Sequence, residues 1–154
     1  TKGENPLCCF GINPSTAEPG NLDNTVKSVQ RLAYYNGFDS WIMLNIYPQR
    51  ATHPAKIHKR INKKIHTENL EAIQRLFEEF GSLKFWAAWG TLIEHRPYFK
   101  RCLKDICQLE EKYNHQWLTI GNLTKAGHPR HPLYIKATTK TQPFNMPAYL
   151  NSVC

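Results

Sequence analysis

The segment Leu-Cys-Cys-Phe-Gly-Ile, residues 7–12, runs directly into the polar turn sequence Asn-Pro-Ser-Thr at 13–16. Later apolar runs end in the same way at residues 41–45, 85–91 and 117–120, and the last leads into a loop ending His-Pro-Leu-Tyr at 131–134. Short continuous apolar runs are typical of buried parallel strands, and open α/β sheets bind ligands beyond the carboxyl ends of their strands. We therefore expect one pocket to collect the polar residues Asn13, Asn45, Thr91 and His131.

Helical patterns occupy the intervals between these runs. Apolar residues recur at helical spacing in 25–36, 67–80 and 97–113, and Asn24 is a suitable cap for the first of these helices. Because strand and helix alternate, we expect a three-layer α/β/α fold with a four-stranded, mostly parallel sheet in the order 2-1-3-4. A length of 154 residues suits one compact domain. We assign that domain to residues 1–135 and expect 136–154, rich in Thr, Gln, Asn and Pro, to form an irregular tail.

The charge and the cysteines restrict the class of protein. Lysine and arginine total 20 against 12 acidic residues, a formal net charge of +8, which attracts polyanions but also serves plain solubility. The five cysteines form no C-x-x-C pair, which argues against a zinc cluster or a disulfide framework and fits a reducing cytosol. No apolar run approaches the ~18 residues of a membrane span, and the first residues show no signal-peptide pattern. We therefore expect a cytoplasmic protein without membrane contact, metal or cofactor.

Four motif blocks, in this order and spacing, carry a resemblance that spans nearly the whole chain: GINPSTA (11–17), LNIYPQRATHP (44–54), AAWG (87–90) and LTKAGHPRHPLY (123–134). They resemble the domain-of-unknown-function family 1643. More distantly, the same blocks are similar to the uracil-DNA glycosylase superfamily, whose fold is a four-stranded parallel sheet flanked by helices. This second resemblance implies an enzyme that cleaves the bond between a base and its sugar.

The glycosylase resemblance implies roles for individual residues. Asn13 matches the asparagine of a G-I-N-P motif that helps to position the attacking water, and Asn45 matches an asparagine that reads the edge of the base. His131 matches the histidine of a His-Pro-Ser motif, which stabilises negative charge on the departing base. Around these positions we expect further substrate contacts from Ser15, Thr16, Arg50, Gly90, Thr91 and Tyr134.

Departures from the glycosylase pattern favour binding over rapid catalysis. Ser15 replaces the glycine that follows G-I-N-P, Leu133 replaces the serine after His-Pro, and no D-P-Y-H sequence supplies a water-activating carboxylate. A side-chain amide cannot take a proton, so Asn13 can orient water but cannot act as a general base. His128 and His131 have no third ligand in view, so metal binding is not expected.

The strongest basic feature is the segment 56–66, which follows the predicted end of the second strand. Its isoleucines recur at i, i+4 spacing, which predicts a basic amphipathic turn or helix. That element is either a solvated face over the core or a surface that contacts phosphates. Under the second interpretation, the residues that follow a nucleic-acid backbone are Lys56, Lys59, Arg60, Lys63 and Lys64.

Three functions fit these observations. The first is recognition of a nucleobase in a nucleic acid, DNA more readily than RNA, or in a nucleotide, with N-glycosylase-type hydrolysis as an additional step. The second is non-catalytic binding of a nucleic acid or nucleotide on the same fold. The third is a hydrolase or transferase that acts on a small anionic metabolite. A pocket without a carboxylate favours the second function over the first.

Overall fold

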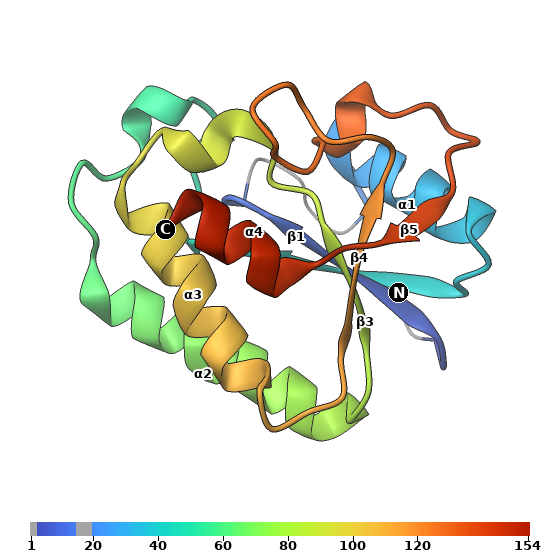
Figure 1. Ribbon diagram of the computed structural model, residues 1–154, viewed down its shortest axis with the longest axis horizontal. Coiled ribbons are helices and arrows are strands. Elements are labelled where there is room, and N and C mark those ends of the chain that lie inside the picture. The colour runs from blue at the N-terminus through green and yellow to red at the C-terminus, as the bar shows by residue number, and fades with distance from the viewer. Residues whose placement is uncertain (1–2, 15–19) are drawn as a thin grey trace.

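The computed structural model describes residues 3–14 and 20–154 as an alternation of strands and helices (Figure 1). Its strands are β1 (Pro6–Gly11), β2 (Ser40–Asn45), β3 (Lys84–Ala87), β4 (Gln116–Ile120) and β5 (Thr141–Pro143). The α-helices are α1 (Asn24–Tyr35), α2 (Lys63–Phe80), α3 (Tyr98–Glu110) and α4 (Met146–Val153). Short 3-10 turns form at η1 (Pro54–Lys56), η2 (Gly90–Glu94) and η3 (Pro132–Tyr134). The apolar runs predicted to be strands are β1 to β4.

These strands form one sheet in the order β2-β1-β3-β4-β5. β1 to β4 are parallel, as predicted, whereas β5 pairs antiparallel with β4, with Leu118 opposite Pro143. The prediction of a four-stranded sheet was wrong, because the segment expected to form an irregular tail contributes β5 and then α4. The polar sequence Thr-Gln-Pro can form a strand here because an edge strand is exposed and tolerates proline.

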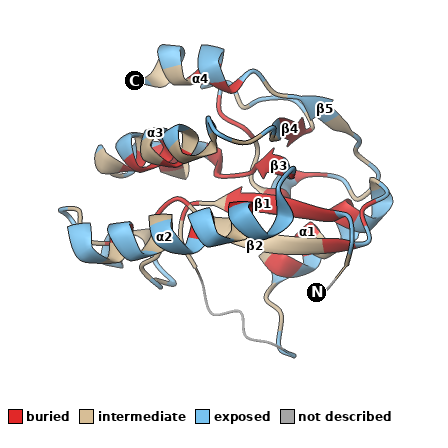
Figure 2. Ribbon diagram, turned by 90° about the horizontal axis from the view of Figure 1, so that it is seen from below, coloured by how far each residue is buried: buried red, intermediate tan, exposed pale blue. Residues whose placement is uncertain are grey.

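Two hydrophobic clusters, one on each face of the sheet, hold the layers together. Alternate side chains of β1 divide between them: Cys8 and Phe10 pack in the cluster that α2, α3 and α4 cover, whereas Leu7 and Cys9 face α1. Figure 2 shows buried central strands between helices whose outer surfaces are exposed. Because both faces are covered, continuous apolar strands are stable in this sheet.

Two helix starts differ from the prediction. α1 is capped by Asp23, whose side chain accepts a hydrogen bond from the backbone N–H of Val26, rather than by Asn24. Asp and Asn are equally good caps, so the residue type alone does not choose between them. α2 begins at Lys63, after the cap Asn62, and only the last part of the basic segment 56–66 is therefore helical.

The first part of that segment is held away from a helix by side chains. The His58 N–H donates to Gln49 Oε1 at 2.7 Å, and the Asn62 N–H donates to the hydroxyl of Tyr47 at 3.0 Å. Backbone donors that are satisfied by side chains do not need the i−4 carbonyls of a helix. The expected amphipathic turn or helix is consequently replaced by η1, an irregular connection and the first turn of α2.

Candidate functional site

The carboxyl ends of the parallel strands bring several of the predicted residues to one edge of the sheet. Gly11 lies opposite Asn45 in the register of β1 and β2, and the Ala88 N–H donates to the carbonyl of Phe10 at 3.0 Å. Because neighbouring strands lie about 4.8 Å apart, the ends of β2 and β3 are separated by roughly 10 Å. The Asn45 Oδ1 atom comes within 3.4 Å of the point where a Cβ on Gly11 would stand. Asn45 therefore lies over the end of β1.

A pocket of about 250 Å³ opens at the end of β3. Gly90, in its wall, has a φ of 61°, in the left-handed region that favours glycine. A Cβ on Gly90 would stand 3.3 Å from the Cβ of His131, so the glycine allows the loop after β4 to approach β3 closely. Four of the residues predicted for the site line this one pocket: Gly90, Thr91, His131 and Tyr134.

His131 is held with one ring nitrogen against the backbone. Its Nδ1 accepts the N–H of Leu133 at 3.3 Å, which places the proton of the neutral ring on Nε2. Burial lowers the pKa of the His131 imidazole below its ordinary value, and the charge of Asp23 offsets part of that shift. Near pH 7 the pocket wall therefore carries a neutral imidazole with Nε2–H as a hydrogen-bond donor.

Asp23 was missed as a site residue. It caps α1, the helix that contacts η3, and its charge acts on His131. A helix that follows a parallel strand begins at the carboxyl edge of the sheet, where ligands bind. The predicted topology could therefore have identified this carboxylate, which stands at the start of the first helix.

Asn13 holds two loops together. Its Nδ2 donates to the carbonyls of Gln49 at 3.3 Å and Ala51 at 3.0 Å, and the Ala51 N–H donates to the carbonyl of Pro14 at 3.1 Å. These bonds tie the loop after β1 to the loop after β2. Because the amide nitrogen is engaged with the backbone, any orientation of water by Asn13 falls to its Oδ1 atom.

The other predicted residues that the structure describes do not line the pocket, so the expectation that one pocket collects Asn13 and Asn45 with Thr91 and His131 is met only for the last two. Asn13 and Asn45 stand at the ends of β1 and β2, and Arg50 is exposed on the loop after β2. Ser15 and Thr16 lie outside the described residues. The pocket also contains two polar side chains that the sequence did not indicate, those of Thr124 and Arg130.

The loop that carries the predicted phosphate contacts is anchored close to the pocket. Nε of Arg96 donates to the carbonyl of His58 at 3.0 Å, and Nε2 of His95 donates to the carbonyl of Pro54 at 2.9 Å. The first residues of η2 line the pocket, and His95 and Arg96 directly follow this turn, so they connect the loop to the pocket wall. We call the exposed basic residues of this loop and of the first turn of α2 the basic loop: Lys56, Lys59, Arg60, Lys63 and Lys64.

A family model described as a protein of unknown function (DUF1643) matches residues 1–133. The chain belongs to this family. It matches no curated protein and no solved structure significantly. The DUF1643 match includes β1 to β4 and the pocket as far as Leu133, and it ends before β5 and α4.

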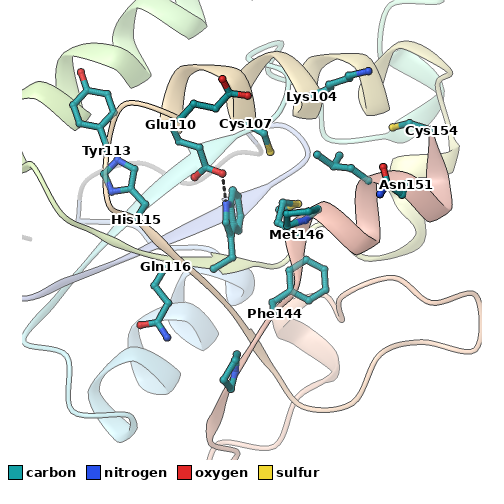
Figure 3. Close-up of a pocket in the computed structure, with 15 residues that line it drawn as sticks. Lys104, Cys107, Glu110, Tyr113, His115, Gln116, Phe144, Met146, Asn151 and Cys154 are labelled. Carbon is teal, nitrogen blue, oxygen red and sulfur yellow. Dashed lines mark hydrogen bonds between the residues drawn. The ribbon is translucent and has the colours of Figure 1, made fainter.

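A larger pocket of this DUF1643 protein, about 790 Å³ in volume, lies between α3 and α4. Figure 3 shows Cys107 and Glu110 of α3 facing Met146 and Phe144 across it. Burial raises the pKa of Glu110 to about 7, although the carboxyl group accepts a hydrogen bond from Trp117 Nε1 at 2.7 Å. None of the predicted site residues that the structure describes lines this pocket. Because open α/β sheets bind ligands at strand ends, we take the smaller pocket as the candidate site.

Potential metal ligands do not gather in the part of this DUF1643 protein that the structure describes: no group of three or more His, Cys, Asp or Glu side chains there could hold an ion. Within the same residues, no helix combines the length and apolar character needed to cross a bilayer. The polar side chains in the pocket wall are Thr91, Thr124, Arg130, His131 and Tyr134, and the charge of Asp23 acts on His131.

Proposed function

We propose that this DUF1643 protein recognises a nucleobase, within a nucleic acid or a nucleotide, in the pocket at the end of β3. The observation that carries the proposal is His131, a neutral ring whose Nε2–H donor belongs to the wall of a strand-end pocket. Bases offer ring nitrogens and carbonyl oxygens as acceptors to such a donor. The resemblance of four motif blocks to uracil-DNA glycosylases supports the same interpretation.

The size of the pocket and an aromatic ring beside His131 support a base as the ligand. Its volume of about 250 Å³ lies below the ~300–1,000 Å³ usual for drug-sized ligands, which favours a single ring system over a dinucleotide. Tyr134 is 76% exposed, and its ring centroid lies 6.1 Å from that of His131. An exposed aromatic ring beside a hydrogen-bond donor offers stacking and recognition of the base edge together.

Hydrolysis of the bond between base and sugar is a second proposed step. The described residues that line the pocket include no carboxylate, and the carboxylate whose charge acts on His131 is that of Asp23. In this step the carboxylate of Asp23 takes a proton from water, and the water oxygen attacks the sugar carbon. The electron pair of the breaking C–N bond goes to the base, where the Nε2–H of His131 stabilises the negative charge. The motif resemblance gives Asn13 the role of orienting that water.

The basic loop after β2 is the proposed contact for a phosphate backbone. Lys63 and Lys64 occupy the first turn of α2, where the helix dipole disfavours a cation and favours an anion. Lys64 approaches Glu68 only at 4.0 Å with its side chain 83% exposed, so this pair neutralises little of its charge. Bound phosphates relieve that unfavourable arrangement, which supports a polyanionic ligand.

Binding of single-stranded oligonucleotides is expected to weaken with salt, with a log–log slope of about 0.7 per phosphate contacted. A variant that replaces four basic residues of the loop should show a flatter slope, because fewer counterions are released on binding. Fluorescence anisotropy at several salt concentrations measures both slopes. The substitutions are Lys59→Ala, Arg60→Ala, Lys63→Ala and Lys64→Ala.

The matched control removes the same charge from exposed positions on or next to α2 and α3, through Arg75→Ala, Arg101→Ala, Lys104→Ala and Lys112→Ala. It should leave the slope close to that of the wild type. If both variants flatten the slope equally, or if the wild type does not bind at low salt, the basic loop is an ordinary solvated surface.

A further inference from the structure

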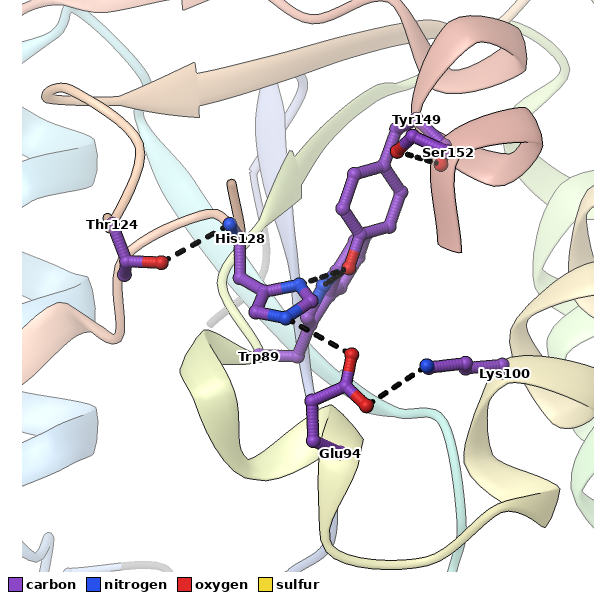
Figure 4. A network of polar contacts seen from close by, with 7 residues as sticks. All are labelled: Trp89, Glu94, Lys100, Thr124, His128, Tyr149 and Ser152. Carbon is purple, nitrogen blue, oxygen red and sulfur yellow. Dashed lines mark hydrogen bonds and ion pairs between the residues drawn. The ribbon is translucent and has the colours of Figure 1, made fainter. Parts of the chain in front are cut away.

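Trp89, which lines the candidate pocket, belongs to a chain of hydrogen bonds that links distant parts of the fold (Figure 4). The Nε1 atom of Trp89, just after β3, lies 2.9 Å from the hydroxyl of Tyr149 on α4, and that hydroxyl lies 2.8 Å from Nδ1 of His128. The Nε2 atom of His128 lies 3.1 Å from Oε1 of Glu94, whose Oε2 pairs with Lys100 at 2.8 Å. His128 is 2% exposed and Tyr149 is 5% exposed, so the centre of this chain is shielded from water.

The chemistry of the partners fixes the direction of each hydrogen bond. An indole N–H can only donate, so the Tyr149 oxygen accepts from Trp89 and its hydroxyl proton goes to Nδ1 of His128. A carboxylate oxygen accepts here, so Nε2 of His128 donates its proton to Glu94. Every polar side-chain atom along the buried part of this chain has a partner, and such a network specifies one geometry.

The loop that carries His128 and His131 is closed on itself. The Thr124 N–H donates to the carbonyl of His128 at 2.8 Å, and the His128 N–H donates to Thr124 Oγ1 at 3.1 Å. Closer to His131, Nε of Arg130 donates to the carbonyl of Asn122 at 2.8 Å. A loop with these internal bonds is constrained along its length, so the anchor at His128 also restrains the residues next to it.

The distance in sequence from His128 to His131 is short, and the buried Pro129 between them has a φ that its ring restricts. The end of β3 holds this stretch at two points. The Trp89 side chain holds His128 through Tyr149, and the backbone of the next residue, Gly90, lies against His131. A change at Tyr149 should therefore reach His131.

We propose that Tyr149 and His128 are positioning residues of the candidate pocket, holding the loop so that the half-buried His131 stays packed against Gly90. This role makes helix α4 part of the site, although α4 lies beyond the residues that the family model matches. The consequence for base recognition rests on the proposed function. The position of His131 itself can be measured without any ligand.

The test is the NMR titration of His131 in the full chain without ligand, with its signal assigned by its loss in His131→Ala. We expect Tyr149→Phe to raise the midpoint by ~0.5 pH unit or more, because burial lowers the pKa of His131 and a loosened loop exposes the ring to water. Asp23, the charged group that acts on His131, is unchanged in this variant. A folded Tyr149→Phe protein with the wild-type midpoint overturns the proposal.

Tyr98→Phe is the matched control, because it removes a tyrosine hydroxyl that donates to the carbonyl of His58 at 2.8 Å, outside this chain of hydrogen bonds. It should leave the His131 midpoint unchanged. If Tyr98→Phe and Tyr149→Phe move the midpoint equally, the effect is a general loss of stability and the positioning role is rejected.

A second pair of variants keeps the test decisive if Tyr149→Phe does not fold. Glu94→Ala and Glu94→Gln both remove a half-exposed charge, but only glutamine keeps an oxygen that can accept from His128. The His131 midpoint should be higher in Glu94→Ala than in Glu94→Gln. Equal midpoints in these two proteins contradict the proposal.

Activity provides a separate readout. Where base release is measurable, Tyr149→Phe should lower kcat by about 10-fold and leave KM for the oligonucleotide unchanged, since the basic loop is not altered. If the wild type releases no base, this result contradicts only the proposed hydrolysis. The His131 titration still decides the positioning role. Reduced stability of Tyr149→Phe with an unchanged His131 midpoint assigns Tyr149 to the fold only.

Discussion

Replacement of His131 by alanine should slow the release of a base at least ~100-fold, because one donor to the charge on a departing group can contribute about 3 kcal/mol to transition-state stabilisation. Affinity for the oligonucleotide should change little, since the proposed phosphate contacts lie on another loop. The measurement is chromatographic detection of free base under single-turnover conditions. Suitable substrates are oligonucleotides that carry uracil, mismatched or alkylated bases.

His131→Gln is the informative companion to that variant, because an amide can still donate a hydrogen bond at this position. It should retain more activity than His131→Ala. If His131→Ala releases base as fast as the wild type, His131 does not stabilise the departing base. If no substrate yields base above a blank without enzyme while oligonucleotides still bind, the protein is a binder and not a hydrolase.

Asp23→Asn should also reduce base release by ~100-fold or more, if its carboxylate takes the proton from the attacking water. Asparagine is as good a helix cap as aspartate, so the hydrogen bond to the Val26 N–H is kept and the fold should be preserved. The same single-turnover assay, run beside a thermal melt of both proteins, measures the effect.

The Asp23→Asn variant has a second signature. The Asp23 carboxylate raises the pKa of His131 against the effect of burial, so its removal should lower that pKa further and keep the ring neutral to lower pH. An NMR titration of His131 detects this change. If the titration moves as expected but base release does not, Asp23 is an electrostatic neighbour and the source of the base in the reaction lies elsewhere.

The sheet was largely predictable because its central strands are buried on both faces. Leu7, Cys9 and Phe10 lie close together in β1, and their side chains divide between the two faces of the sheet. Such a run of apolar residues is stable only where helices cover both faces, and the same reasoning applies to Trp86 in β3. β5 has no such signal. It is a short polar edge strand held by long-range bonds, such as Asn36 Oδ1 accepting the Thr141 N–H at 2.8 Å, and sequence periodicity does not report such contacts.

The candidate site was predictable at the level of topology. Parallel strands place their carboxyl ends at one edge, so the approach of His131 to Gly90 follows from the positions of the motifs in the chain. The engagement of the Asn13 amide with two backbone carbonyls depends on the path of the loop after β2, which no local pattern encodes. The link from His128 to Tyr149 was equally inaccessible, because α4 was expected to be irregular.

A titration of the protein with free nucleobases, followed by NMR, examines base recognition at the strand-end pocket without assuming catalysis. We expect saturable shifts of His131, Thr91 and Tyr134 for at least one base, and we expect His131→Ala to abolish them. The pocket between α3 and α4, reported by His115, should not respond. Absence of a saturable shift at His131 with every base, or shifts confined to the pocket between α3 and α4, would contradict base recognition at the end of β3.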